Sequence, residues 1–228
     1  TLRLWKAEPV EPIDMPASND QNYEKASREA VRAADMTALL YPGDSKRAGK
    51  TLRLRQQYLL CSATVQDLLR QCPQRERFVE QFAVQLNDTH PTMAVPELIR
   101  ILTSEGMDFE QAAEIAFRAF SFTNHTVMPE ALECWSESLM RAVAPELIPI
   151  IRRLDERLRA QGHEGLCIVE NHTIHMANLA IACTHCTNGV AELHTHILKE
   201  RVFADWHRAY PDRLQNVTNG ITPRRWLG

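Results

Sequence analysis

The sequence predicts an α/β fold in which a Rossmann-like parallel sheet is surrounded by many helices. Apolar residues make up 44% and charged residues 24% of the 228 positions, as in ordinary packed water-soluble domains. The chain has only 8 glycines, roughly half the usual share of ~7%, which favours helices over an all-β sandwich. From Cys72 onward, short apolar runs alternate with longer helical stretches, the pattern of βα units.

Residues 1–71 form the first of two predicted parts. The alternation of apolar and polar residues predicts a strand at 1–8, and a proline-containing loop follows it. Small apolar residues at spacings of three and four predict a helix from Asn22, its N-cap, to Leu40. A polar loop at 43–50 then leads to a long amphipathic helix from Leu52 to about Gln71.

Residues 72–228 form the second part, which holds the βα units. Four apolar runs are predicted as parallel strands: Phe78–Leu86, Ala119–Thr123, Leu166–Val169 and Leu214–Val217. Helices are predicted at 91–104, 108–118, 129–141, 145–160, 173–184 and 189–208.

Each predicted strand ends in a small polar cluster that contains asparagine. The four clusters are Asn87-Asp88-Thr89-His90, Asn124-His125-Thr126, Asn171-His172-Thr173 and Thr218-Asn219-Gly220. In an open α/β sheet, the loops at the carboxyl ends of parallel strands line the ligand crevice. One such cluster more often caps the next helix. Four together predict a ligand site on one rim of the sheet.

The residue types on this rim favour a sugar ligand. Asn, Thr and His offer both donors and acceptors with little net charge, which suits a hydroxyl-rich molecule. Tyr41 and Trp226 are available as an aromatic wall, and Arg224 and Arg225 suit phosphate or carboxylate.

The carboxylates Asp88 and Glu133 are weighed as a general acid/base pair. We expect Glu133 on the exposed face of the helix at 129–141, and Asp88 as a helix cap or an orienter of His90. A two-carboxylate hydrolase is therefore not predicted.

Several classes of function are not expected. The net charge is −3 and the basic residues are scattered, so nucleic acid is not an expected partner. The sequence has neither 18 consecutive apolar residues nor a signal peptide, so we expect a cytoplasmic protein that does not span a membrane. The chain also lacks an initiator methionine, which suggests a piece of a longer protein. No Gly-rich phosphate loop, Gly-x-Ser-x-Gly or His-Glu-x-x-His motif occurs.

Two alternative hypotheses remain open. Cys183-x-x-Cys186, with His172, His175, His194 and His196, superficially offers zinc ligands or a thiol redox pair. The segment before Cys183 continues an apolar helix, however, so buried free thiols are the simpler interpretation, and no metal ligand is assigned. The other alternative is a helix-rich interaction scaffold without a site.

Three stretches closely resemble the α-glucan phosphorylases, the family of glycogen, starch and maltodextrin phosphorylases. They are Gln85-Leu-Asn-Asp-Thr-His-Pro-Thr, Phe122-Thr-Asn-His-Thr-Val-Met-Pro-Glu-Ala-Leu-Glu and Val217-Thr-Asn-Gly-Ile-Thr-Pro-Arg-Arg-Trp. The resemblance runs nearly end to end, including 1–5, 40–44, 52–58, 175–178 and 188–191.

The resemblance implies two Rossmann-like domains facing across a cleft, a glycosyltransferase-B-like architecture. This chain would be part of the N-terminal domain, without the C-terminal one. Family members cleave the terminal α-1,4 bond of a glucan with inorganic phosphate to give α-D-glucose 1-phosphate, using the phosphate of pyridoxal 5'-phosphate as a proton shuttle. The Schiff-base lysine lies in the C-terminal domain, and none of the five lysines here lies in a matching segment. We therefore expect this polypeptide alone to be inactive.

The resemblance also implies roles for individual residues. His125 would meet the hydroxymethyl and scissile region of the glucosyl unit, with Asn219 as its partner on the sixth hydroxyl and Val190 as an apolar neighbour. Asp88, His90 and Glu133 resemble the polar lining beside the bond that breaks, and we assign Asp88 a catalytic role with His125. Trp226 and Arg225 would lie near the cofactor. Asp44 would belong to a gate loop, and the helix at 22–40 would contact the second subunit of a homodimer.

Overall fold

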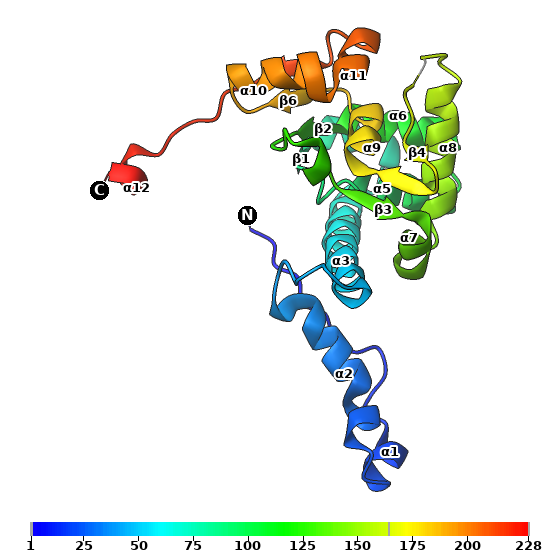
Figure 1. Cartoon of the computed structure of the whole chain (residues 1–228). Helices are drawn as coiled ribbons and strands as arrows, with labels where there is room; N and C mark the ends of the chain where they lie inside the picture. The colour runs from blue at the N-terminus through cyan, green and yellow to red at the C-terminus, as the bar shows by residue number, and fades with distance from the viewer. Residues whose placement is uncertain (1, 164, 228) are drawn as a thin grey trace.

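The structure, a computed structural model, describes residues 2–163 and 165–227 and has an α/β architecture (Figure 1). A four-stranded parallel sheet has the order β1-β2-β6-β7, formed by Val84–Asn87, Phe120–Thr123, Thr187–Gly189 and Leu214–Asn216. In its register Leu86 lies opposite Phe122, Phe122 opposite Thr187, and Thr187 opposite Leu214. A second, antiparallel sheet has the order β3-β5-β4, formed by Cys134–Ser136, Thr173–His175 and Val169–Glu170.

Amphipathic helices surround the parallel sheet. Helix α5 (Ala94–Ser104) packs against α3 (Arg47–Gln71), α6 (Phe109–Ala119) and α8 (Leu147–Arg159). It buries Val95, Leu98, Ile99 and Leu102, whose spacing of three and four residues places them on one face. Helix α6 begins at its N-cap Asp108 and leads straight into β2, where Phe120 and Phe122 are fully buried. These contacts hold the carboxyl ends of the strands at one edge of the molecule.

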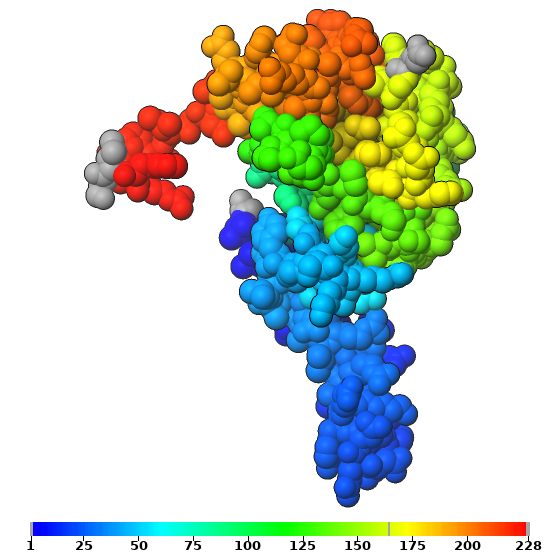
Figure 2. Space-filling view, in the orientation of Figure 1, coloured from blue at the N-terminus to red at the C-terminus, as the bar shows by residue number. Residues whose placement is uncertain are grey.

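The N-terminal part projects from this body. Helices α1 (Met15–Asn19) and α2 (Tyr23–Ala38) form the stalk at the foot of Figures 1 and 2. Asn22 is the N-cap of α2, as predicted, and accepts from the Lys25 amide at 3.1 Å. Helix α3 begins at Arg47, earlier than the predicted Leu52.

The strand predicted at 1–8 is wrong for the described residues 2–8, which are extended but pair with no strand. Their polar and aromatic side chains bind α3 instead. Trp5 Nε1 donates to Thr64 Oγ1 at 3.3 Å, and Arg3 pairs with Asp67 at 3.2 Å. Alternation in the sequence cannot supply the neighbouring strand edge that a strand needs.

Two of the predicted parallel strands are corrected. The strand predicted at Phe78–Leu86 begins only at Val84, because Arg75–Arg77 and Phe78–Gln81 form a 3₁₀ turn and a short helix, η1 and α4. Only Val169 of the third apolar run is in a strand, β4 of the antiparallel hairpin, and Asn171 and His172 are the two-residue turn of that hairpin, with φ of 47° and 59°. Positive φ at both positions is the signature of a type I′ hairpin turn. The remaining strand of the parallel sheet is β6, which the sequence analysis did not predict.

Three of the predicted helices are interrupted. Residues 129–141 comprise η2 (Pro129–Ala131), strand β3 and α7 (Glu137–Val143), which begins after its N-cap Ser136. Residues 173–184 comprise β5 and α9 (Met176–Cys183). Residues 189–208 comprise β6's last residue, α10 (Glu192–Ile197), a π-helical turn η3 (Leu198–Val202) and the start of α11 (Ala204–Ala209). In the described part of the chain, no helix combines the length and the apolarity needed to cross a bilayer.

Candidate functional site

The carboxyl ends of β1 and β2 bring Asn87, Asp88 and His125 together. His125 Nε2 lies 2.6 Å from Asn87 Oδ1, and the exposed imidazole faces solvent at the rim. The Asp88 amide donates to the Thr123 carbonyl at 2.8 Å, which continues the sheet by one further bond. The His125 ring and the Asn87 side-chain amide, which belong to two separately predicted polar clusters, are therefore direct neighbours.

Asp88 adopts a strained backbone conformation, with φ at 64°. Its Oδ1 accepts from the Thr89 amide at 2.8 Å, and its Oδ2 accepts from the Thr126 hydroxyl at 3.3 Å. Left-handed backbone at a residue other than glycine costs of order 1–3 kcal/mol and is found at functional sites as well as in turns such as Asn171-His172. The strain turns the Asp88 carboxylate toward the loop that carries His125.

The end of β6 forms the next part of the rim. The Val190 amide donates to His194 Nδ1 at 3.0 Å, and the Val190 carbonyl accepts from the Asn219 amide at 2.9 Å. The Asn219 side chain is exposed. Burial lowers the pKa of His194, and the charge of His125 lowers it further, against the opposing effect of Asp88. Val190 and Asn219 are thus joined through their main chains.

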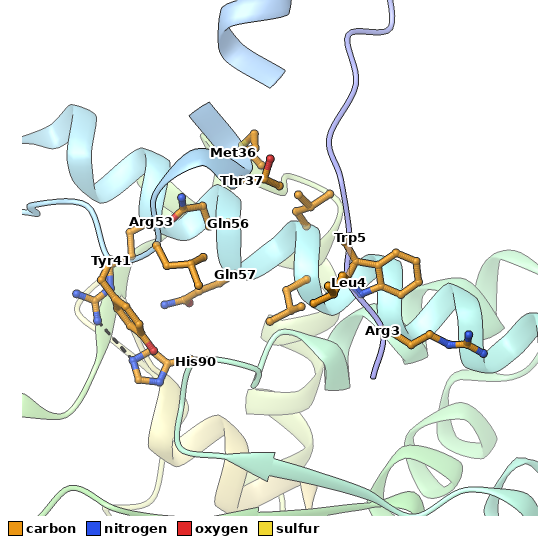
Figure 3. Close-up of a pocket in the computed structure, with 13 residues that line it drawn as sticks. Arg3, Leu4, Trp5, Met36, Thr37, Tyr41, Arg53, Gln56, Gln57 and His90 are labelled. Atoms are coloured by element: carbon orange, nitrogen blue, oxygen red, sulfur yellow. Dashed lines mark hydrogen bonds between the residues drawn. The ribbon is translucent and has the colours of Figure 1, made fainter. Parts of the chain in front are cut away.

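A second group of residues, the Arg53 cluster, consists of Tyr41, Asp44, Arg53, His90 and Glu133, of which Figure 3 labels Tyr41, Arg53 and His90. Arg53 Nη1 lies 3.1 Å from Asp44 Oδ2, and Nη2 lies 3.5 Å from His90 Nε2 and 3.8 Å from Glu133 Oε1. Its guanidinium carbon lies 5.7 Å from the centre of the Tyr41 ring, which meets the His90 ring edge-on at 5.8 Å. Asp44, His90 and Glu133, three separately predicted site residues, therefore converge on one guanidinium group.

Glu133 differs from its predicted setting. It lies in the turn before β3 rather than on an exposed helix face, and its side chain is only 10% exposed. Gln57 Nε2 donates to Glu133 Oε1 at 2.8 Å. The correction follows from β3, which interrupts the predicted helix and directs Glu133 toward α3.

Arg53 and Gln57 are not among the site residues predicted from the sequence. They lie four positions apart on α3 and so share one helix face, within the stretch 52–58 that carries part of the resemblance. Their spacing of four residues within this stretch is the signal that could have identified them.

A cavity of about 370 Å³ adjoins the Arg53 cluster, which contributes Tyr41, Arg53 and His90 to its wall (Figure 3). Its other walls are mostly apolar and come from the N-terminal segment, the end of α2 and α3. An aromatic ring and a cation beside an apolar hollow provide the mixed lining typical of small-molecule sites.

Trp226 and Arg225 lie apart from the rim. They belong to α12 (Pro223–Leu227), in the C-terminal segment that projects away from the body in Figure 2. Trp226 is 80% exposed, and its Nε1 donates to Thr222 Oγ1 at 3.0 Å. Neither α12 nor the rim segments 84–90, 120–126 and 187–194 contain a lysine. These residues do not by themselves make a site for pyridoxal phosphate.

The cysteines offer little support to the zinc and redox hypotheses. Burial raises the pKa of Cys183 to about 12 and also raises that of Cys186, whereas a redox thiol requires a lowered pKa. Among residues 2–163 and 165–227, no group of three or more His, Cys, Asp or Glu side chains is arranged to hold a metal ion.

Comparison with known proteins identifies the family of this chain. The family model for carbohydrate phosphorylases matches residues 1–228. The alpha-glucan phosphorylase H isozyme of Triticum aestivum is 42% identical over 252 residues, covering 100% of this chain and 30% of the relative. The glycogen phosphorylases of Saccharomyces cerevisiae and Chlamydia trachomatis are 41% and 39% identical, covering 99% and 100% of this chain. The chain spans 27% and 30% of these two relatives. This chain therefore belongs to the carbohydrate phosphorylase family.

Proposed function

We propose that the chain is part of the N-terminal domain of an α-glucan phosphorylase with a glycosyltransferase-B-like architecture. The whole enzyme would release α-D-glucose 1-phosphate from α-1,4-glucans or maltodextrins with inorganic phosphate and pyridoxal phosphate. The 228-residue chain alone would be inactive, because the rim carries no lysine for the cofactor. The observation that carries the proposal is the family match over the whole chain, together with the approach of His125 to Asn87 beside Asp88.

The rim chemistry supports a sugar-binding role. His125, Asn87 and Asn219 offer hydrogen-bond donors and acceptors, and the hydroxyls of a glucosyl unit need both. In the proposed site His125 contacts the hydroxymethyl and scissile region, Asn219 the sixth hydroxyl, and Val190 the apolar face of the ring. Asp88 serves as the carboxylate beside His125.

The Arg53 cluster supports a gate near this site. Tyr41 has φ at 55°, an unusual conformation for an aromatic residue, and it begins the short connection to α3 that contains Asp44. The Asp44–Arg53 ion pair ties this connection to His90 and Glu133, so movement of residues 41–46 would rearrange the polar lining. We assign the connection to gating and His90 and Glu133 to the pocket lining. Trp226 and Arg225 would meet the cofactor only when the rest of the protein covers α12.

The projecting helix α2 supports a role in subunit contact. Tyr23 is 65% exposed and Val31 53% exposed, and the small residues between them allow close helix packing. A homodimer would cover these side chains. Residues 1–71 would then form the gate and contact part, and residues 72–228 the sugar-binding βα part. We expect a cytoplasmic enzyme. A relative from Arabidopsis thaliana that is 41% identical is named alpha-glucan phosphorylase 2, cytosolic.

The test uses the longest open reading frame that contains this sequence. The purified protein, loaded with pyridoxal phosphate, is incubated with maltoheptaose and inorganic phosphate, and α-D-glucose 1-phosphate is measured. The proposal predicts formation of this product that depends on phosphate, and none with the 228-residue chain alone. Release of free glucose without phosphate, or no product from the long protein, would contradict the proposal.

A further inference from the structure

We propose that His194 is a positioning residue of the proposed glucan site, acting as a neutral imidazole that fixes the turn from β6 into α10. The proposal rests on the proposed function and extends it to a residue of α10, the helix that follows β6. His194 aligns the main chain of Val190 and, through it, Asn219. It touches neither substrate nor cofactor in this role.

The hydrogen bond between the Val190 amide and His194 Nδ1 fixes the protonation of the ring. The Val190 amide donates to His194 Nδ1 at 3.0 Å, so this nitrogen must present its lone pair. A neutral imidazole has one protonated nitrogen, and here that must be Nε2. In the imidazolium ion both nitrogens are donors, and the bond to Val190 would be lost. The hydrogen bond therefore selects one tautomer of the neutral ring.

The second argument is what the Val190 peptide holds in turn. Its carbonyl accepts from the Asn219 amide at 2.9 Å, and the preceding Gly189 carbonyl accepts from the Val217 amide at 3.1 Å. Residues 215–220 are otherwise exposed, so these two bonds fix the path of the segment after β7. A shift of the Val190 peptide would therefore move Asn219 with it.

The third argument is the close approach of α10 to the end of β6. A Cβ atom added to Gly189 would lie 3.1 Å from His194 Nδ1 and 2.4 Å from Thr195 Oγ1. Thr195 Oγ1 in turn lies 3.0 Å from Asn216 Oδ1 on β7. A side chain at position 189 would therefore crowd the imidazole where it accepts from the Val190 amide. This approach and the hydrogen bond are independent signs that the turn is built around the His194 ring.

The electrostatic surroundings agree with a neutral ring. Burial lowers the pKa of His194, and the nearby His125 lowers it further, while Asp88 raises it by less. Nε2 is buried and contacts no acceptor among the described residues. The anchoring role therefore depends on Nδ1 alone, so a substitution that keeps or removes an acceptor at the position of Nδ1 can test it.

The first part of the test uses the 228-residue chain labelled with ¹⁵N at histidine. Long-range ¹H–¹⁵N correlation spectra distinguish the two neutral tautomers from the imidazolium ion. The proposal predicts the Nε2–H tautomer for His194 at pH 8 and protonation of the ring at a lower pH than that of an unperturbed histidine, which titrates near 6.5. An Nδ1–H tautomer, or protonation near 6.5, would overturn the role of His194 whatever the activity of the enzyme.

The second part uses the long protein and two nearly isosteric variants. The Oδ1 atom of asparagine can replace Nδ1 as acceptor, whereas glutamine places its amide near Nε2 and leaves the Val190 amide without a partner. His194→Gln is expected to raise KM for the glucan about tenfold with kcat changed less than threefold, the effect of losing one hydrogen bond that positions a binding residue. His194→Asn is expected to stay within about threefold of the wild type in both constants.

His196→Gln is the matched control, because His196 is exposed on the same helix and should leave both constants unchanged. Thermal unfolding of each variant shows whether the fold is intact. Equal defects in His194→Asn and His194→Gln, or none in His194→Gln, would overturn the positioning role. An inactive wild-type long protein would instead overturn the proposed function, and the role in glucan binding with it, while the tautomer result would still stand by itself.

Discussion

Gly189→Ala is the substitution that most directly probes the turn between β6 and α10. The added Cβ would lie 2.4 Å from Thr195 Oγ1, closer than real Cβ contacts permit, and 3.0 Å from Thr195 Cα, tighter than most real Cβ contacts. Thr195 Oγ1 cannot easily withdraw, since it lies 2.9 Å from the Ala191 carbonyl oxygen and 3.0 Å from Asn216 Oδ1. Either α10 moves away from β6, or these contacts break.

The size of the effect follows from two opposing contributions. Overpacking of a close contact costs about 1–3 kcal/mol. Replacing glycine by alanine restricts the unfolded chain and stabilises the fold by about 0.4–1 kcal/mol. We therefore expect a net loss of about 1–2 kcal/mol in the free energy of unfolding, or a Tm lower by about 2–8 °C for a chain of this size.

The assay is urea unfolding followed by circular dichroism, with Gly220→Ala as the matched control. A Cβ at Gly220 would meet no atom within 4 Å, so that variant shares the effect on the unfolded chain without the contact. We expect Gly220→Ala to equal or slightly exceed the wild type in stability. Equal unfolding midpoints for Gly189→Ala and Gly220→Ala would refute the close approach of α10 and weaken the account of His194.

Three further predictions concern a carboxylate, a gate contact and the cysteines. Hydrogen bonds from Arg152 and then His172 lower the pKa of Glu137 from 4.5 to about 2, so its contribution to stability is present above pH 4.5 and is lost as the pH falls toward 2. The stability difference between the wild type and Glu137→Gln should therefore shrink between pH 6 and pH 3 in urea titrations, and a constant difference would contradict the ion pair. Arg53→Gln removes the partner of Asp44, so trypsin should cleave after Lys46 severalfold faster than in the wild type, whereas Arg55→Gln should leave the rate unchanged. Cys183, buried with its pKa raised to about 12, should resist a thiol reagent at pH 8 while exposed Cys134 reacts first, and rapid modification of Cys183 in the folded chain would contradict its burial.

Helices with a clear apolar face were predictable from the sequence. The stretches predicted at 91–104, 108–118 and 145–160 correspond to α5, α6 and α8, with bounds that differ by at most three residues. Strand β2 was predicted to within one residue of its observed position, because Phe120 and Phe122 form a short buried run followed by polar residues. In these segments, local periodicity and tertiary packing require the same conformation.

Strand β6 could not be predicted in the same way. Thr187-Asn188-Gly189 has no apolar run, and it becomes a strand because β2 and β7 pair with it on both sides. The opposite case is the run at 166–169, where apolar residues suggested a parallel strand and the Asn171-His172 turn made an antiparallel hairpin. The first error arose because the strands that pair with β6 lie far away along the chain. The second arose because the pairing of the run at 166–169 depends on the backbone conformation of a turn.

Some residues of the candidate site could likewise be predicted from the sequence, and others could not. Asp88 and His125 could be predicted because they directly follow β1 and β2, and carboxyl ends of parallel strands meet at one edge. Arg53 and His194 lie on helices, and only the approach of α3 and α10 to the sheet reveals their partners. Sequence patterns identify residues that a strand end presents, but not residues that another element brings to it.

The proposed sugar site depends most on His125. The most direct test is the kcat/KM of a His125 variant in phosphorolysis. In the long protein, His125→Ala should lower kcat/KM for maltoheptaose by a factor that corresponds to roughly 2–4 kcal/mol, the scale of a lost positioned group. His185→Ala is the control, because His185 is exposed at the amino end of β6, the opposite edge of the same sheet. A large loss in His125→Ala and none in His185→Ala is the predicted result, and equal kcat/KM values in the two variants would contradict the assignment of the rim as the glucan site.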